Sequence, residues 1–187
     1  NPDGTLTVTL DREGSYTAAR TGNLREKGIP EPPDLTRFTS VKDPSEKFHF
    51  SALDVSGAPM SDVDPRFQGK VVVLTLGGTW CPNCHDEMPS LVALDKEFRA
   101  QGLEVVGLFF ENDPDIAVAK PRIASFVRRY KVEFPLLFAG TRDDGPKKLT
   151  QLNNFAVYPT TIFIGRDGLI EYANPAALRL VGAATPD

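Results

Sequence analysis

The feature that most constrains this 187-residue chain is a buried-strand pattern that leads into a pair of cysteines. Residues Val71 to Leu76 are almost all apolar and rich in β-branched side chains, as in a strand covered on both faces. A short connection then reaches Trp80-Cys81-Pro82-Asn83-Cys84. Strands of this kind belong to parallel sheets with helices on their faces. The sequence therefore predicts an α/β fold with the cysteines at the end of a central strand.

A helix is predicted directly after this strand. Pro82 suits the first turn, and the helix should run to about Arg99, with Gly102 as its stop. Three apolar residues are spaced to form one buried face: Leu91, Leu94 and Phe98. Pro89 lies inside the helix, where it removes a backbone donor and should produce a kink.

The rest of the chain continues the alternation of strands and helices. The predicted elements are a strand at Leu103–Phe110, a helix at Pro121–Tyr130, a strand at Phe134–Phe138, a helix at Lys147–Asn154 and a hairpin of Thr160–Ile164 with Leu169–Tyr172. Pro135 indicates an edge strand or a strand start. The first two strands form a βαβ unit with a right-handed crossover. A closing hairpin makes the predicted sheet mixed.

Three segments are predicted along the chain. Residues 1–27 form a β-hairpin extension, or the remnant of an upstream β domain, because Thr5–Leu10 and Ser15–Ala18 flank turn residues. Residues 28–47 contain clustered prolines and are predicted as a linker. Residues 48–187 form the main domain, which opens with a second short hairpin. The chain begins at Asn1 without an initiator Met, so a preceding leader or membrane anchor is left open.

Composition excludes several classes of protein. The net charge of −4 and pI near 5.3 argue against a nucleic-acid-binding surface. The apolar runs are far shorter than the ~20 residues of a membrane-spanning helix. With 41% apolar and 25% charged residues, the chain is typical of folded, soluble domains. The only two cysteines lie three residues apart, so they resemble a redox pair more than a structural disulfide.

The position of the cysteines predicts their chemistry. A thiolate attacks disulfides, so a reactive cysteine needs a lowered pKa. Cys81 is predicted at a helix N-terminus, where unpaired N–H groups and the helix dipole favour negative charge. Cys84 lies one turn later and should be more shielded. We therefore expect Cys81 to attack and Cys84 to resolve the resulting mixed disulfide.

From Phe48 to Tyr172 the chain resembles the thioredoxin superfamily, and within it the TlpA-like and ResA-like proteins. The resemblance rests on Trp80-Cys81-Pro82-Asn83-Cys84, on Glu87-Met88-Pro89 and on Tyr158-Pro159-Thr160-Thr161. It implies a mixed sheet flanked by helices and the reduction or exchange of protein disulfides outside the cytoplasm. It also implies a disulfide or dithiol protein as substrate, an electron-donor protein as partner, and no cofactor or metal.

The same resemblance assigns site residues. Pro159 would be the cis-proline facing the dithiol, and Glu87 the acidic group beneath the active-site helix. Trp80, Pro82 and Tyr158 would shape the surface that contacts the substrate. Thr75 departs from the pattern, because many thioredoxins carry a buried Asp there. The tail from Ala173 to Asp187 also departs from it, since it is short for the usual last helix.

Other functions remain open on the sequence. Cys81, Cys84 and His85 match a haem-attachment motif, and with His49 they are the only candidates for a zinc site. The fold could also serve as a non-catalytic binding module. A thioredoxin-fold peroxidase would require Pro at position 74 and Thr at position 78, where this chain has Leu74 and Gly78. Glu111 is expected to be a surface charge, and both histidines are expected to be solvated or hydrogen-bonded.

Overall fold

A computed structural model describes residues 5–10, 14–18, 26, 28, 39–155 and 157–174. The chain divides into two compact units, residues 1–34 and residues 35–187. In the first unit, β1 (Leu6–Leu10) and β2 (Gly14–Ala18) pair antiparallel, which confirms the predicted hairpin. Half of the predicted linker, residues 29–38, lies outside the described residues, and so does most of the tail whose last helix was expected to be truncated or absent. The three-segment division stays a prediction.

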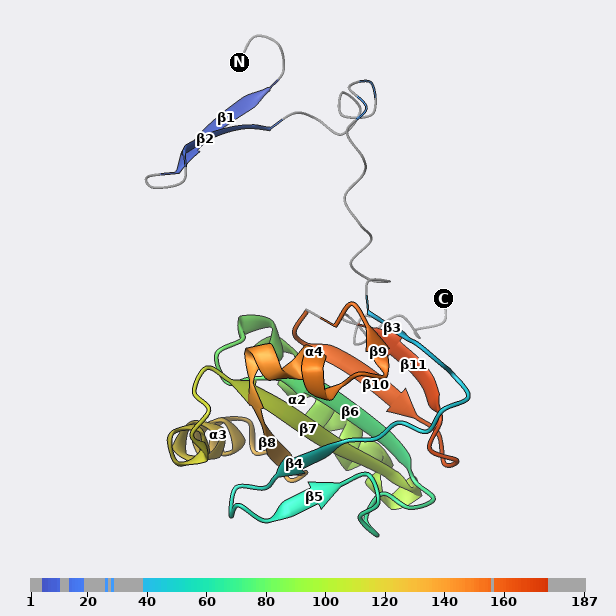
Figure 1. Cartoon of the computed structure of the whole chain (residues 1–187). Coiled ribbons are helices and arrows are strands. Elements are labelled where there is room, and N and C mark those ends of the chain that lie inside the picture. Colours follow the sequence, from blue (N-terminus) through green and yellow to red (C-terminus); the bar gives the residue numbers. More distant parts are fainter. Residues whose placement is uncertain are drawn as a thin grey trace, which may run out of the picture. The chain divides into compact units, whose positions relative to one another are not determined.

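The second unit is a seven-stranded mixed sheet with helices (Figure 1). Its strands are β3 (Ser40–Val41), β4 (Ser51–Leu53), β5 (Pro59–Ser61), β6 (Val71–Gly77), β7 (Leu103–Glu111), β8 (Leu136–Thr141), β9 (Leu152–Asn153), β10 (Thr160–Ile164) and β11 (Ile170–Asn174). Its helices are α2 (Pro82–Phe98), α3 (Ile116–Tyr130) and α4 (Gly145–Lys148), with 3₁₀ turns η2 (Arg99–Gln101) and η3 (Arg142–Asp144).

The central sheet has the order β11-β10-β6-β7-β8-β4-β5. Strands β6, β7 and β8 run parallel, whereas β10 pairs antiparallel with both β6 and β11, and β4 pairs antiparallel with β8 and β5. The short strands β3 and β9 form a separate antiparallel pair. The predicted central strand, βαβ unit and closing hairpin are therefore confirmed.

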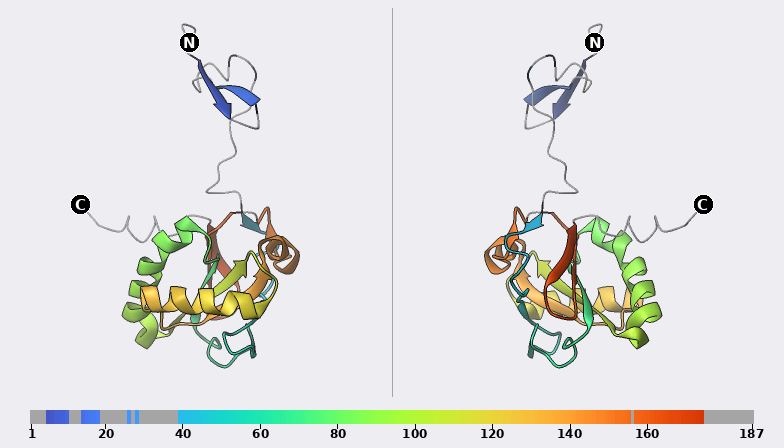
Figure 2. Two further views of the ribbon diagram at one scale, coloured as in Figure 1. Left: turned by 90° about the vertical axis from the view of Figure 1, so that its left-hand side faces the viewer. Right: turned by 90° about the vertical axis from the view of Figure 1, so that its right-hand side faces the viewer.

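Apolar side chains of β6 point alternately to the two faces of the sheet, as the two-residue period of a strand requires. On one face Val73 packs with residues of α2 and α3, including Leu91 and Ile123. On the other face Leu74 belongs to a second cluster that includes Phe155. Figures 1 and 2 show α2 and α3 covering one face. The dithiol segment thus follows a strand whose two faces are both packed against apolar side chains.

Three predicted boundaries were wrong. Helix α3 begins at Ile116 and not at Pro121, because the Asp115 carboxylate accepts the Ala117 amide at 2.8 Å and caps the helix. The predicted helix Lys147–Asn154 is only the short α4, and Leu152–Asn153 pair with β3 instead. Strand β8 covers Leu136–Thr141 and not Phe134–Phe138; it begins directly after Pro135, which confirms the proline as a strand start, inside the sheet and not at its edge.

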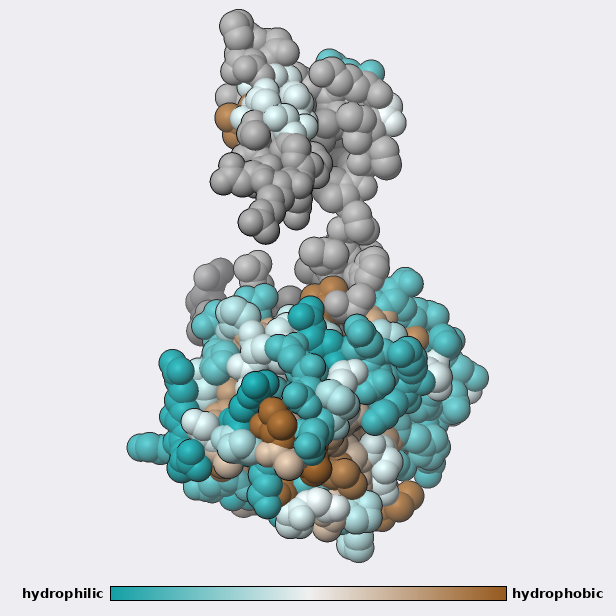
Figure 3. Space-filling view, turned by 60° about the vertical axis from the view of Figure 1, so that its left-hand side comes forward, coloured by the Kyte–Doolittle hydropathy of each residue, from teal (hydrophilic) through white to brown (hydrophobic). Residues whose placement is uncertain are grey.

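The surface of the second unit is mainly hydrophilic on the face shown in Figure 3, where hydrophobic residues gather in small patches. Within the described part of the chain, the exposed large hydrophobic residues are Leu6, Val55, Val63 and Val118. No helix among these residues has the length and apolarity needed to cross a bilayer.

Candidate active site

The two cysteines lie where β6 passes into α2. Cys81 is the N-cap residue, with φ −92° and ψ 111°, and Pro82 follows as the first helical residue. The Cys81 Sγ accepts a hydrogen bond from the Cys84 amide at 3.3 Å, and the Cys81 carbonyl accepts the His85 amide at 3.3 Å. A sulfur that accepts a helix N-terminal amide is stabilised as a thiolate. Cys81 therefore lies at the N-terminus of the helix, as predicted.

Both cysteines are free thiols with little exposed surface, 3% of Cys81 and 2% of Cys84. Cys84 lies deeper in the protein than Cys81, which agrees with the expectation that it is the more shielded of the two. Hydrogen bonding also distinguishes them. Donation by the Cys84 thiol, aided by backbone amides, lowers the pKa of Cys81 to about 7 against the opposing effect of burial. The same hydrogen bond, together with burial, raises the pKa of Cys84.

Glu87 lies in the first part of α2 with its carboxylate turned toward the sheet. It is 8% exposed, and its two oxygens accept the hydroxyls of Thr161 at 2.5 Å and Thr75 at 2.9 Å. Burial raises the pKa of this carboxyl, and the two threonine hydrogen bonds oppose the rise. Thr75, the departure noted in the sequence, is thus a hydrogen-bond partner of Glu87.

Trp80 precedes the dithiol and is fixed on several sides. Its indole Nε1 donates to the Phe110 carbonyl at 2.7 Å, and its ring meets Tyr158 edge-on with centroids 5.4 Å apart. The Arg142 guanidinium lies 4.0 Å from the Trp80 ring centroid, which is within cation–π range. Trp80 therefore links the dithiol loop to η3 and to the segment before β10.

Tyr158 and Pro159 stand beside Trp80. The peptide bond between them is cis, as the resemblance implied. The Tyr158 hydroxyl donates to the Arg142 carbonyl at 3.2 Å, and burial raises the pKa of this phenol. Pro82 is exposed next to Cys81. The structure thus brings Tyr158 against Trp80, the residue that precedes the dithiol.

His85 is half-buried, and both of its ring nitrogens have partners. Nδ1 lies 2.7 Å from the Tyr130 hydroxyl, and Nε2 lies 2.9 Å from the Thr79 carbonyl. This agrees with a hydrogen-bonded histidine and leaves neither nitrogen free to bind a haem iron. Among the residues that the structure describes, no three His, Cys, Asp or Glu side chains are grouped as a metal site would require.

Comparison with known proteins assigns the family. The AhpC/TSA family profile matches residues 42–173, well over half of the chain. The chain belongs to the AhpC/TSA family. Among curated relatives, this AhpC/TSA protein is 30% identical over 136 residues to the thiol-disulfide oxidoreductase ResA of Bacillus thuringiensis subsp. konkukian, covering 73% of this chain and 71% of the relative. It is 27% identical to ResA of Bacillus subtilis over 131 residues, covering 70% of this chain and 66% of the relative.

Solved structures agree on the fold. A DsbF homologue from Corynebacterium diphtheriae superimposes with a TM-score of 0.60 at 19% identity, covering 81% of this chain and 94% of that one. A thiol-disulfide oxidoreductase from Bacteroides fragilis superimposes with a TM-score of 0.56 at 17% identity, covering 73% and 98%. These findings confirm the predicted thioredoxin-like mixed sheet. The role rests on the ResA relatives, which show that this AhpC/TSA protein is a thiol-disulfide oxidoreductase.

The sequence alone does not identify two residues of the site, Glu111 and Arg142. Glu111 is fully buried, so the expectation of a surface charge was wrong, because both carboxylate oxygens bind Thr79. The signal available was its place at the end of a parallel strand beside the dithiol strand. Arg142 carried no local signal, since its contact with Trp80 joins distant parts of the chain.

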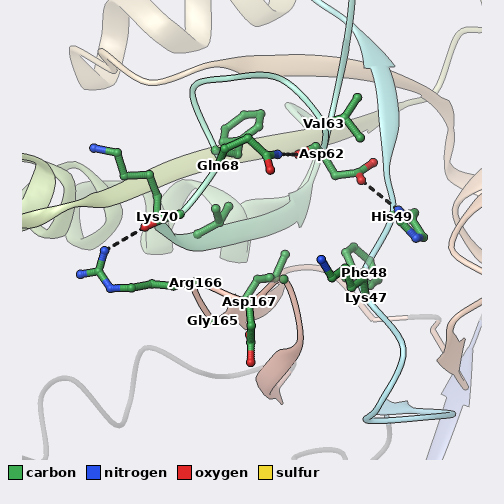
Figure 4. A pocket seen from close by; sticks show the side chains of 15 residues that line it. Lys47, Phe48, His49, Asp62, Val63, Gln68, Lys70, Gly165, Arg166 and Asp167 are labelled. Carbon is green, nitrogen blue, oxygen red and sulfur yellow. Dashed lines mark hydrogen bonds and ion pairs between the residues drawn. The ribbon is translucent and has the colours of Figure 1, made fainter.

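Three hollows in the protein surface can be compared with the position of the dithiol. One of about 390 Å³ lies between the dithiol loop and α3, and one of about 500 Å³ lies between η3 and Tyr158. A third, of about 180 Å³, includes Lys70 and Val72 at the opposite end of β6 (Figure 4). There His49 pairs with Asp62 at 2.9 Å. Of these three hollows, only the first two include residues that belong to the dithiol loop or contact it.

Proposed function

We propose that Cys81 and Cys84 are the working dithiol of this oxidoreductase and that its substrates are disulfides in partner proteins. The observation that carries the proposal is the hydrogen-bonded cysteine pair at the start of α2, where the pKa of Cys81 is lowered to about 7 and that of Cys84 is raised. At neutral pH a large fraction of Cys81 is then thiolate, whereas Cys84 keeps its proton.

The reaction proceeds in two exchanges. The Cys81 thiolate attacks one sulfur of the substrate disulfide, forms a mixed disulfide and releases the other substrate sulfur as a thiolate, which takes up a proton. Cys84 then loses its proton and attacks the Cys81 sulfur, which releases the second substrate thiol and closes the Cys81–Cys84 disulfide. The substrate gains two electrons and two protons. A partner dithiol protein returns them to this chain, and the direction reverses with the relative reduction potentials.

Glu87 is proposed to exchange the proton of Cys84. Its buried carboxyl has a raised pKa, so it can hold a proton at a higher pH than an exposed glutamate. A negative charge on Glu87 also raises the pKa of both thiols, although this effect is smaller than the effects of burial and of the hydrogen bond within the pair. Loss of a proton from Cys84 is therefore coupled to the charge on Glu87.

The contact surface for the substrate is proposed to consist of Trp80, Pro82, Tyr158 and Pro159. Its support is the position of Tyr158 against Trp80 and the exposure of Pro82 beside Cys81. Family resemblance further supports a place outside the cytoplasm and an electron-donor protein as second partner. A membrane anchor in a preceding segment is part of the same proposal.

The test is reduction of a neutral small disulfide, hydroxyethyl disulfide, and of the disulfides of insulin by the reduced protein. Wild type should react in single turnover and end with the Cys81–Cys84 disulfide, which mass spectrometry detects as the loss of two hydrogen atoms. Cys81→Ser should abolish the reaction. Equal rates for wild type and Cys81→Ser would show that Cys81 is not the attacking thiol and would favour a non-catalytic binding module.

A further inference from the structure

A hollow of about 390 Å³ lies directly beside the dithiol loop. One wall is made by Thr79 and Trp80, the residues that precede Cys81, together with His85. The other wall is one side of α3, which contributes Arg122 and Arg129. The attacking cysteine is therefore next to a hollow with two guanidinium groups at its rim.

Neither Arg122 nor Arg129 forms an ion pair with a carboxylate among the residues that the structure describes. Within the described ranges, the ion pairs involve other side chains, and Arg122 and Arg129 are both exposed. Arg129 lies 5.4 Å from the ring centroid of the neighbouring Tyr130, whose hydroxyl is bound to His85. One cation is thus held in place beside the hollow without being neutralised.

The charge around the hollow is opposite to that of the whole protein. The chain has a net charge of −4, yet no acidic residue lines this hollow. Arg142 adds a third cation on the Trp80 ring, from the neighbouring hollow. The acidic residues next to its lining, Asp86 beside His85 in the chain and Glu111 hydrogen-bonded to Thr79, do not line it themselves. A local positive potential in an acidic protein attracts anionic groups.

The spacing of the two arginines indicates the size of the ligand. They are seven residues apart on α3, which places them about 10 Å apart along the helix axis. An extended chain covers that distance in roughly three residues. Serine and phenylalanine side chains, from Ser125 and Phe126, lie between them on the wall. The hollow therefore suits a short peptide segment better than a single small anion.

We propose that this hollow binds an acidic segment of the partner polypeptide whose disulfide reacts at Cys81, with Arg122 and Arg129 as its charge partners. The inference rests on the proposed function, because it gives the class of substrate that the dithiol selects. The two arginines are specificity determinants on the rim. They touch neither sulfur of the dithiol.

The test uses two synthetic peptides, each with one cysteine in a mixed disulfide with mercaptoethanol. One has glutamates on both sides of the cysteine, and the other has glutamines at the same positions. Reduced wild type should react faster with the glutamate peptide. In the Arg122→Gln, Arg129→Gln protein, its second-order rate constant should fall roughly three- to tenfold at low salt, while the glutamine peptide should react unchanged. At about 1 M salt the preference should vanish.

Arg128→Gln is the matched control, because Arg128 is exposed on the same helix but does not line the hollow. A second variant, Arg122→Glu with Arg129→Glu, should reverse the preference in favour of a peptide with lysines at those positions. Equal rates of wild type on the two peptides, or an equal loss in Arg128→Gln, would overturn the inference and leave the function intact. Failure of wild type to reduce hydroxyethyl disulfide as well would overturn both.

Discussion

The buried carboxylate of Glu111 holds Thr79 by two groups at once. It accepts the Thr79 amide at 2.8 Å and the Thr79 hydroxyl at 2.7 Å. Glu111 ends β7, and Thr79 lies in the connection from β6 to α2. The carboxylate therefore ties the dithiol loop to the neighbouring parallel strand and fixes the direction in which Cys81 enters its helix.

Replacing Glu111 by Ala should lower the free energy of unfolding by about 1–3 kcal/mol, because the Thr79 donors lose their acceptor inside the protein. Cys81 should also react more slowly with hydroxyethyl disulfide, since the loop is no longer fixed. Urea unfolding and single-turnover rates measure the two effects. Glu111→Gln keeps the volume and one acceptor, so its loss should be smaller. An Ala variant that matches wild type in both measurements would contradict this role.

Gly78→Ala should disrupt the contacts of Trp80. A Cβ at Gly78 would lie 2.4 Å from the Trp80 indole nitrogen and 2.6 Å from the Phe110 carbonyl oxygen, which are the two atoms of one hydrogen bond. Such overpacking costs roughly 1–3 kcal/mol. Trp80 is the only tryptophan, so its fluorescence should report the displacement directly.

Gly107→Ala is the comparison for that prediction. Its Cβ would meet the end of the Leu136 side chain at 2.5 Å, in the core on the α2 and α3 face of the sheet. That variant should lose stability while the Trp80 emission and the rate at Cys81 stay close to wild type. If both glycine variants change the emission equally, the effect at Gly78 is general unfolding and not a local displacement.

Much of this fold could be predicted because its signals are local. The apolar run at Val71–Leu76 could only be a buried strand, and Pro82 directly after a cysteine marked a helix start. Errors arise where two local signals compete. The sequence predicts a helix from Pro121, whereas the Asp115 cap starts α3 before it and the proline lies inside.

The site was predictable only in part, for a physical reason. Cys81 and Cys84 are neighbours in sequence, so their spacing shows their chemistry. Glu111 is 32 residues from Thr79, and no periodicity reveals that a charged strand end will be buried by two hydrogen bonds to one loop residue.

Glu87→Gln should change how stability depends on pH. Burial raises the pKa of Glu87, so the folded protein keeps a proton that the unfolded chain releases near the ordinary value of 4.5. Stability from this group therefore falls as pH rises from about 4.5 to the raised pKa and is constant above it. A glutamine does not titrate, so the variant should gain stability relative to wild type across that interval.

Urea midpoints at several pH values check this, best in a background with both cysteines replaced by serine so that no thiol titrates. The same substitution in the native background should lower the pKa of Cys81, because a negative Glu87 raises it. A stability difference between Glu87 and Gln that is independent of pH would show that the carboxyl does not titrate unusually in the folded state.

The alkylation rate of Cys81 should rise with pH and level off, with a midpoint of about 7, because the thiolate is the reacting species. The Cys84 thiol is the main donor that lowers this pKa. Cys84→Ala should therefore move the midpoint up toward the ordinary 9.0, and Cys84→Ser, whose hydroxyl can still donate, should fall between the two. Iodoacetamide kinetics with mass mapping of the labelled residue measure all three midpoints. A common midpoint would show that the pair is not coupled.

The Cys84→Ser protein should be blocked at the resolving step. Its Cys81 can still attack a substrate disulfide, but no second thiol is present to displace the substrate from the mixed disulfide. Mixed disulfides with insulin chains should therefore accumulate on non-reducing gels and disappear when dithiothreitol is added. The Cys81→Ser protein should form none, because Cys84 is protonated at neutral pH and buried more deeply than Cys81. Mixed disulfides in Cys81→Ser and none in Cys84→Ser would exchange the roles assigned to the two cysteines.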